Sequence, residues 1–355
     1  MFVMNTWYIA GWAHEVGHQP LARTICNEPI VLFRDMATRK VGALQDRCCH
    51  RGTPLRYGEV VEGGLQCGYH GLVFDCAGSC VSIPGQEKVP AKAKVRSYPI
   101  VEKDEFVWIW MGEPEKADPS KILDYPYHND HRKWPHKHDV YHVKANYMLL
   151  VDNLMDLTHL GYVHKSTIGG SPKTHVEAKM TVTPTETGLH FIRWMPDSVP
   201  PPSYRKAVPT LAERVDRWQE FEYFAPGSII QWSGALDVER GAMQNRDQDG
   251  GFSLRLFHGL TPETEDTCFY FWSTANGYRQ DDPSATEDLF KEIGVAFSED
   301  KQIVEGQHAM LRRTGEDGLV DIVSDRARVH MRRIVIKQLA AEASPKPSTE
   351  PAVNA

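Results

Sequence analysis

Two short loops within residues 48–71 restrict what this chain can fold into more than any other segment does. Cys48 and His50 form a C-x-H pair, and a C-x-x-H pair of Cys67 and His70 begins after sixteen intervening residues. Glycine and proline, which permit sharp backbone reversals, fill the turns between the pairs. These turn-forming residues are Gly52, Pro54, Gly58, Gly63, Gly64, Gly68 and Gly71. The segment predicts either a covalent cross-link or a metal site.

Three interpretations of these four side chains compete. Chance clustering of buried cysteine and histidine accounts poorly for a mixed pair that occurs twice. A structural zinc site usually pairs like with like, as C-x2–4-C and H-x3–5-H. A Rieske [2Fe–2S] cluster places two cysteines on one iron and two histidines on the other, so mixed pairs let each loop hold both irons. The motif therefore favours a Rieske cluster bound by Cys48, His50, Cys67 and His70.

The other cysteines do not indicate a disulfide framework. The chain has seven cysteines, an odd number, and Cys26 and Cys268 stand alone, as buried apolar residues do. Cys49 lies between two ligand candidates and is expected to point away from the cluster. Cys76 and Cys80 form a C-x3-C pair that could bind a metal or cross-link. Packing beneath the cluster loops is the simpler expectation for this pair.

Charge and hydropathy argue against several partners. The net charge is −7 and no run rich in lysine or arginine occurs, so neither nucleic acid nor an anionic membrane is expected as a partner. No uncharged apolar run approaches the roughly 18 residues that a membrane span requires. The first residues lack the basic segment of a signal peptide. A cytoplasmic location is expected.

The order of the sequence patterns predicts an α+β fold in two domains. Residues 1–112 contain short alternating runs such as "PIVLFRD", "KVGALQD" and "EFVWIWMG", which are typical of antiparallel β-structure. Proline-spaced polar sequence at 111–126 marks the domain boundary, so a second domain is expected over 113–342. Strand-like runs there are "HFIRWM", "GSIIQWSG", "FSLRLFHGL" and "CFYFWSTA", with helices around 146–160 and 285–312. The polar tail, 343–355, is expected to be disordered.

A second group of candidate ligands lies within the apolar helical sequence at 146–170. Asp156 and His159 are three residues apart and share a helix face. His164 is about 140° away from that face on a continuous helix, so both imidazoles can bind one metal only if the helix breaks. Gly161 is where such a break would be tolerated. Two separate core histidines are the alternative, but the nearby carboxylate weakens it.

The long helix near 285–312 offers a third ligand. Its apolar positions predict one buried stripe: Leu289, Ile293, Ala296, Phe297, Ile303, Val304 and Leu311. Asp300 falls on this stripe, whereas Glu299 does not. A carboxylate on a buried stripe costs several kcal/mol unless it is paired or binds a metal. Two histidines and one carboxylate form the facial triad of non-heme Fe(II) oxygenases, so His159, His164 and Asp300 are predicted to bind a mononuclear iron.

Together these motifs resemble the terminal oxygenases of the Rieske non-heme iron oxygenase family, most nearly the vanillate O-demethylase oxygenase subunits. The likeness runs from "NTWYIAGW" through "GYHGLVFDCAGSCVSIPGQ", "VDNLMDLTH" and "VPPPSYRKAV" to "FSEDKQIVEGQ". One departure is Cys49, where vanillate enzymes usually have proline. The resemblance implies an N-terminal all-β Rieske domain, a helix-grip α/β catalytic domain and a head-to-tail homotrimer. It also implies that Asn153 and Asp156 are catalytic, with Asp156 bridging the partner subunit's His70 to His159.

The resemblance further implies O2-dependent O-demethylation of a methoxylated, vanillate-like aromatic acid, with release of formaldehyde. Electrons would come from NAD(P)H through a separate ferredoxin-type flavin reductase, because this chain has neither a G-x-G-x-x-G motif before a helix nor a four-cysteine cluster. Hydroxylation or dihydroxylation of another aromatic acid is one alternative. A Rieske electron carrier without oxygenase activity is another, and it would hold two irons per chain instead of three.

The substrate pocket is expected to draw on three segments, residues 195–208 and the strands around 228–234 and 252–258. Arg205, in the first of these, is a candidate partner for a substrate carboxylate, although a surface position is the more ordinary place for an arginine.

Overall fold

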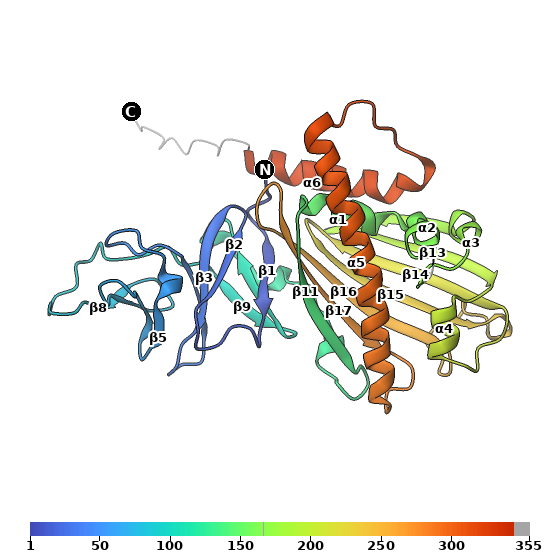
Figure 1. The fold of residues 1–355 in the computed structure, drawn as a ribbon, viewed down its shortest axis with the longest axis horizontal. Helices are drawn as coiled ribbons and strands as arrows, with labels where there is room; N and C mark the ends of the chain where they lie inside the picture. The colour runs from blue at the N-terminus through green and yellow to red at the C-terminus, as the bar shows by residue number, and fades with distance from the viewer. Residues whose placement is uncertain (166, 344–355) are drawn as a thin grey trace, which may run out of the picture.

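The computed structural model describes residues 1–165 and 167–343, which form a β-rich N-terminal part and a larger part built on one wide sheet (Figure 1). The α+β fold predicted from the sequence is confirmed. Most of the predicted tail (343–355) lies outside the described residues. Within the described residues no helix combines the length and the apolar content needed to cross a membrane.

The N-terminal part contains three small antiparallel sheets. The first has the order β1-β10-β9, the second β2-β3-β4 and the third β5-β6-β7-β8. Both β1 and β10 are buried along their whole length, because apolar side chains cover both faces. The strands are β1 (Trp7–Trp12), β2 (Leu21–Ile25), β3 (Glu28–Arg34), β4 (Val41–Gln45), β5 (Glu59–Val61), β6 (Gly64–Gln66), β7 (Val73–Phe74), β8 (Cys80–Ser82), β9 (Ile100–Lys103) and β10 (Phe106–Trp110).

The C-terminal part is built on a seven-stranded antiparallel sheet with the order β11-β17-β16-β15-β14-β13-β12. β11 and β12 follow one another in the chain but form the two opposite edges of the sheet, because β11 pairs with the last strand, β17. The strands are β11 (His136–Val143), β12 (Lys179–Pro184), β13 (Gly188–Ser198), β14 (Val215–Phe224), β15 (Ser228–Asp237), β16 (Phe252–Pro262) and β17 (Cys268–Asn276).

Helices cover one face of this sheet (Figure 1). The long α5 packs on β11 and β17, α1 packs on β16 and α5, and α6 packs on α1 and β13. The helices are α1 (Tyr147–Met155), α2 (Leu160–Val163), α3 (Pro172–Val176), α4 (Pro202–Ala207), α5 (Pro283–Thr314) and α6 (Arg326–Ala343). Short 3-10 turns are η1 (Leu55–Tyr57), η2 (Pro114–Lys116), η3 (Pro119–Lys121), η4 (Pro126–His128), η5 (Leu157–His159), η6 (Val238–Arg240) and η7 (Val323–Asp325).

The stripe predicted on α5 is buried at five of its seven apolar positions, together with Asp300. The expectation for Ile303 is wrong, since this side chain is 54% exposed. Ile303 lies beside an open cleft instead of the sheet. Leu311 is only partly buried, close to the end of the helix.

The two parts share a core. One apolar cluster contains Tyr8 and Ile109 from the N-terminal part together with Leu150 and Leu256 from the C-terminal part. A backbone carbonyl of β1 also accepts a hydrogen bond, since Thr261 Oγ1 lies 2.8 Å from it. This continuous packing holds the two parts in a fixed arrangement.

Candidate metal centres and substrate cavity

The two cysteine loops fold in the same way. The N–H of Gly52 donates to the carbonyl of Cys48 at 2.9 Å, and the N–H of Gly71 donates to the carbonyl of Cys67 at 3.0 Å. Both glycines have a left-handed φ, +73° and +72°, which a side chain would disfavour. The repeated turn explains why glycine follows each cysteine by four residues.

The four cluster candidates differ in exposure. Cys48 and Cys67 are each 2% exposed, whereas His50 and His70 are exposed, with ring centroids 4.5 Å apart. Burial, and further the adjacent Cys67 thiol, raises the pKa of Cys48 to about 11, so two thiolates here need cations beside them. These residues fit a cluster whose cysteine side is buried and whose histidine side faces outward.

The remaining cysteines are free thiols. Cys76 and Cys80 pack in the same apolar cluster as Cys48 and Cys67, so the expected packing beneath the cluster loops is confirmed. Cys49 is exposed.

The second group of candidates comes together between the η5–α2 segment and α5, where His164 and Asp300 are buried and His159 is partly buried. His159 Nε2 lies 3.4 Å from Asp300 Oδ1, and His164 Nε2 lies 3.1 Å from the same oxygen. One ligand atom from each of the three residues lies within 4.8 Å of the others. Two imidazoles and one carboxylate that converge in this way can hold a divalent iron and leave coordination positions open.

Hydrogen bonds orient each of these side chains. His159 Nδ1 donates to the carbonyl oxygen of Asp156 at 2.5 Å, and His164 Nδ1 donates to Glu299 at 2.7 Å. Asn153 Nδ2 donates to Asp300 Oδ1 at 3.0 Å. With Nδ1 engaged, both histidines present Nε2 toward Asp300, as metal-binding histidines held by outer hydrogen bonds do.

The backbone around His159 and His164 differs from the predicted helix with a break at Gly161. The helix ends at Asp156, whose φ of −128° is extended and whose carboxylate caps the following 3-10 turn by accepting from the Thr158 N–H. That interruption, upstream of both histidines, reorients the chain. Gly161 has another role, since a Cβ there would lie 2.4 Å from Cα of Pro172. The shared helix face expected for Asp156 and His159 is therefore wrong.

The local charges suit a metal. Burial would raise the pKa of Asp300, but His159 and His164 outweigh it and hold that pKa well below its usual range. Burial would lower the pKa of His164, yet Asp300 and Glu299 raise it. The site concentrates two carboxylates around one buried imidazole, so a divalent cation would be stabilised there.

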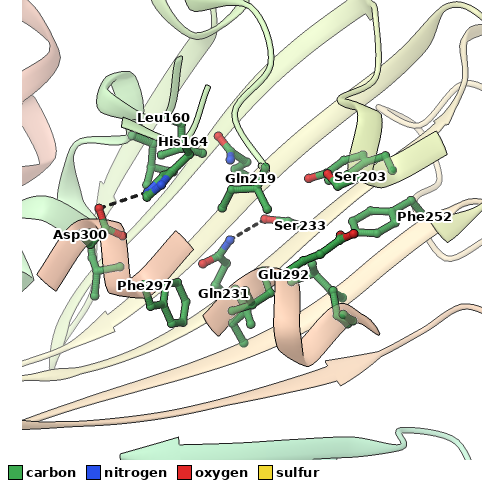
Figure 2. A pocket seen from close by; sticks show the side chains of 18 residues that line it. Leu160, His164, Ser203, Gln219, Gln231, Ser233, Phe252, Glu292, Phe297 and Asp300 are labelled. Atoms are coloured by element: carbon green, nitrogen blue, oxygen red, sulfur yellow. Dashed lines mark hydrogen bonds and ion pairs between the residues drawn. The ribbon is translucent and has the colours of Figure 1, made fainter. Parts of the chain in front are cut away.

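A cavity of about 50 Å³ begins at His164 and Asp300 (Figure 2). Its walls are mainly apolar, and each of the three segments expected to form the pocket contributes. The lining residues are Leu154, Leu157, Leu160, Ile168, Ser203, Tyr204, Gln219, Gln231, Ser233, Phe252, Leu254, Leu256, Leu289, Glu292, Ile293 and Phe297, besides the two candidate ligands.

A chain of hydrogen bonds orients the polar groups on the β15 wall of this cavity. Burial lowers the pKa of His258 to about 3, so its imidazole is neutral. His258 lies 2.7 Å from the Tyr270 hydroxyl and 3.0 Å from Gln231 Oε1. The Gln231 amide therefore donates to Ser233 Oγ, at 2.7 Å. The Ser233 proton remains free to be donated into the cavity (Figure 2).

The neighbouring strand, β14, adds further donors. Arg193 donates to Gln219 Oε1 at 2.9 Å, which leaves the Gln219 NH2 group available. Arg217, on the same face of β14, is 1% exposed, and its three guanidinium nitrogens have no hydrogen-bond partner among the described residues. It stacks 5.1 Å from the ring of Tyr204, which lines the cavity. Arg205 is exposed and donates to the Glu213 carbonyl, so it is a surface arginine.

Sequence reasoning missed Glu299, Arg217, Gln219 and Gln231 as site residues. The sequence holds a signal for two of these residues. Arg217 and Gln219 lie at alternate positions with the buried Val215 and Phe221 on β14, so they are polar residues on an inward face.

Comparison with known families agrees with both the cluster site and the mononuclear iron site. The Rieske [2Fe–2S] domain family matches residues 6–99, and the family of vanillate O-demethylase oxygenase C-terminal domains matches residues 143–342. The prediction of a [2Fe–2S] cluster and a non-heme iron is confirmed at the level of the cofactors. The zinc scaffold and the electron carrier without oxygenase activity are excluded as interpretations.

Individual relatives cover nearly the whole chain. The toluene-4-sulfonate monooxygenase system iron–sulfur subunit of Comamonas testosteroni is 37% identical over 96% of this chain and 98% of its own length. A vanillate O-demethylase oxygenase subunit from Pseudomonas sp. is 35% identical, with 96% of each chain covered. The crystal structure of dicamba monooxygenase bound to 3,6-dichlorosalicylic acid superposes with a TM-score of 0.88 at 32% identity, and covers 97% of this chain and 99% of that one. The chain therefore belongs to the Rieske non-heme iron monooxygenases.

Proposed function

We propose that this protein is the oxygenase component of an aromatic O-demethylase, which oxidises the methyl group of a methoxylated aromatic acid. The observation that carries the proposal is the cavity, which has the predicted iron-binding side chains at one end and the donors of Gln219 and Ser233 on its sheet wall. Its one lining carboxylate besides Asp300, that of Glu292, is paired with Lys206 at 3.1 Å. A ring compound with an anionic group would place that group near the donors and its other side near the predicted iron ligands.

The donors select the charge of the substrate. Gln219 and Ser233 each have a proton to donate into the cavity, because their acceptor atoms are already occupied. Arg217 brings a buried positive charge without a carboxylate beside it, and such a charge is costly unless an anion neutralises it. A carboxylate next to Tyr204 would supply that anion. The apolar walls, such as Leu256 and Phe297, would hold the ring.

Orientation then follows from the two ends of the cavity. With its carboxylate at the Tyr204 end, beside which Arg217 is buried, an aromatic acid presents its opposite substituent to His164 and Asp300. The bound iron supplies reductive activation of O2. The reaction converts Ar–O–CH3, O2, two electrons and two protons to Ar–O–CH2OH and water. The C–O bond of this hemiacetal then breaks to give a phenol and formaldehyde.

A head-to-tail homotrimer would complete the electron path. The cluster loops lie at one end of the fold, well separated from α1 and α2 above the wide sheet (Figure 1), and His50 and His70 are exposed. Asp156 and His159 line an open cleft of about 710 Å³. We assign this cleft to the cluster loop of a second subunit, with Asp156 bridging the partner subunit's His70 to His159. A ring of heterologous contacts can close such an arrangement, whereas an isologous dimer cannot.

The apolar rim of the cleft supports this assignment. Ile303, Leu319 and Val320 are 54%, 66% and 82% exposed and line the same cleft. Exposed apolar patches of this kind mark protein contacts. Electrons would reach the cluster from NAD(P)H through a separate ferredoxin-type flavin reductase.

A second candidate reaction is hydroxylation of the methyl group of an aryl sulfonate. The toluene-4-sulfonate relative favours it, and a sulfonate offers the same donors an anion. The test is a paired screen of methoxybenzoates and methylated arylsulfonates with the reduced holoenzyme. Formaldehyde released in proportion to O2 consumed supports O-demethylation. A benzyl alcohol product without formaldehyde would assign the second reaction instead.

A further inference from the structure

Several histidines gather around Glu105 at the seam between the two domains, away from the iron-binding side chains. Glu105 lies in the turn between β9 and β10, with a left-handed φ of 66°. His136 and His138 lie on β11 of the large sheet, and His128 and His131 belong to the segment that leads into it. The cluster therefore combines side chains from both parts of the chain.

The distances within this group suit a metal ion. His136 Nε2 lies 3.0 Å from Glu105 Oε2, and His138 Nδ1 lies 3.9 Å from the same oxygen. One ligand atom from each of these three residues lies within 4.8 Å of the others. Tetrahedral zinc with ligands at about 2.0–2.2 Å requires ligand atoms roughly 3–4 Å apart. Small side-chain adjustments would therefore complete the geometry.

The hydrogen bonds of His136 favour a cation at this position. Its Nδ1 donates to the carbonyl of Trp134 at 3.0 Å, so a neutral ring carries its lone pair on Nε2. That lone pair points at the Glu105 carboxylate, which is unfavourable unless a proton or a metal ion lies between them. A histidine whose outer nitrogen donates to a carbonyl is oriented as metal-binding histidines are.

His138 offers a second lone pair. Its Nδ1 is buried and has no hydrogen-bond partner among the described residues, and its ring stacks on Trp12 with centroids 4.1 Å apart. A buried imidazole nitrogen without a hydrogen-bond partner is available to coordinate a metal ion.

The surrounding histidines have different roles. His128 donates from Nδ1 to the Asp104 carbonyl and places Nε2 against the Ser273 hydroxyl, at 2.8 and 2.9 Å, so both its nitrogens are occupied. His131 Nε2 lies 3.3 Å from Glu105 Oε1, with an exposed side chain. His131 can approach as a fourth ligand from the solvent side.

We propose that Glu105, His136 and His138 form a third metal site, which binds a divalent transition ion such as Zn²⁺ and joins the two domains. Two imidazoles and one carboxylate are a ligand set that zinc accepts, with solvent or His131 in the fourth position. Because the ligands come from both domains, binding stabilises the folded chain over the unfolded one.

The test uses the holoenzyme, loaded with its cluster and iron and dialysed against buffered Zn²⁺, followed by metal counting. We expect one zinc per chain in addition to an unchanged iron content, and a higher melting temperature with zinc. The variants Glu105→Gln and His136→Gln should each weaken zinc binding at least about tenfold and remove the zinc-dependent rise. Two variants are used so that a folding defect in one does not decide the result.

The matched control is His142→Gln. His142 lies on the same strand and pairs with a single carboxylate, Glu263, so this variant should bind zinc as the wild type does. Three outcomes would overturn the proposal: no zinc uptake, equal uptake by wild type and Glu105→Gln, or loss of one iron for each zinc gained. The last would show that zinc enters the iron site instead.

Discussion

Glu299 Oε2 lies 2.7 Å from Nδ1 of His164, while the next residue of α5, Asp300, lies 3.1 Å from Nε2 of the same ring. Two consecutive acidic residues thus contact opposite edges of one imidazole. Such an arrangement fixes both the tautomer and the tilt of His164. If His164 binds the iron as predicted, Glu299 would act as a positioning residue for it.

Replacing Glu299 by glutamine should therefore loosen iron binding without abolishing it. The amide can still contact His164, but it no longer stabilises the ring by charge, and we expect iron affinity to fall about 10- to 100-fold. Iron titration of the apo-protein, with the cluster absorbance as an internal reference, measures this. Asp300→Ala should lose the mononuclear iron altogether, and Glu305→Gln on the same helix should bind iron normally. Unchanged affinity in Glu299→Gln would rule out the positioning role.

The Asp156→Asn variant should separate electron transfer from metal binding. Its carboxylate caps η5 through the Thr158 N–H at 3.0 Å, which asparagine can also do, so the fold and both metals should persist. The contact to His159 uses the backbone carbonyl of residue 156 and is kept in the variant. At the other end of the proposed bridge, the amide NH2 would face the N–H of the partner subunit's His70, which needs an acceptor, a misfit of about 1–3 kcal/mol. We expect single-turnover reoxidation of the reduced cluster to slow about 10- to 100-fold. Reoxidation at the wild-type rate would leave Asp156 with a capping role only.

The Arg217→Met variant should be more stable and less active. Methionine fills similar apolar space and removes a buried charge that has no partner, which should stabilise the free protein by about 1–3 kcal/mol. The KM for an aromatic acid should rise about 10- to 100-fold, since hydrogen bonds to charged groups contribute roughly 1.5–3 kcal/mol. Denaturant unfolding and steady-state kinetics test both parts. Arg205→Met is the control, because Arg205 is a surface residue. A KM that does not change would remove Arg217 from substrate binding.

Assembly can be tested at the rim of the cleft. Val320 is 82% exposed, and Val320→Asp would place a charge in the proposed contact, so the trimer should dissociate into folded monomers. Light scattering after size-exclusion chromatography gives the mass, and the cluster spectrum reports the fold. Met243→Asp, at another exposed apolar position, should stay trimeric. A Val320→Asp protein that also stays trimeric would exclude this rim from the interface.

Acidification should destabilise the protein through His258, which is buried behind the cavity wall. Burial holds the pKa of His258 at about 3, well below its unfolded value of about 6.5. Its contribution to stability is therefore fully present above pH 6.5 and is lost as the pH falls toward 3. The slope is about 1.4 kcal/mol per pH unit for one proton. Urea unfolding between pH 7.5 and 5 should show a steeper decline for the wild type than for His258→Gln, and equal slopes would contradict the assignment.

Much of the fold follows from local patterns in the sequence. The runs that form β3, β10, β16 and β17 alternate or are continuously apolar, and the apolar spacing of α5 predicts a long helix with Asp300 inward. The cysteine and histidine spacing predicts the cluster because one loop geometry, closed by a glycine, occurs twice. The domain limits at 112 and 342, and the ligand roles of the individual residues, stay predictions.

The remaining features depend on tertiary structure. Ile303 fits the apolar period of α5, yet the helix extends past the sheet there and exposes it. The break at Asp156 comes from side-chain capping of the next turn, which periodicity does not register. Arg217 becomes notable only because the sheet register places it opposite Met195 and Ala235, where its guanidinium finds no hydrogen-bond partner among the described residues.

The core shared by the two domains also limits how members of this family can be recombined. Tyr8 and Ile109 pack in one cluster with Leu150 and Leu256, so a cut near residue 112 exposes apolar surface on both fragments. A chimera that takes its redox domain from one enzyme and its pocket from another must therefore match side chains across this seam. Exchanging the cluster domain or the pocket domain between enzymes therefore requires first that the side chains of the shared core fit together. Only then can electron transfer and substrate choice be combined.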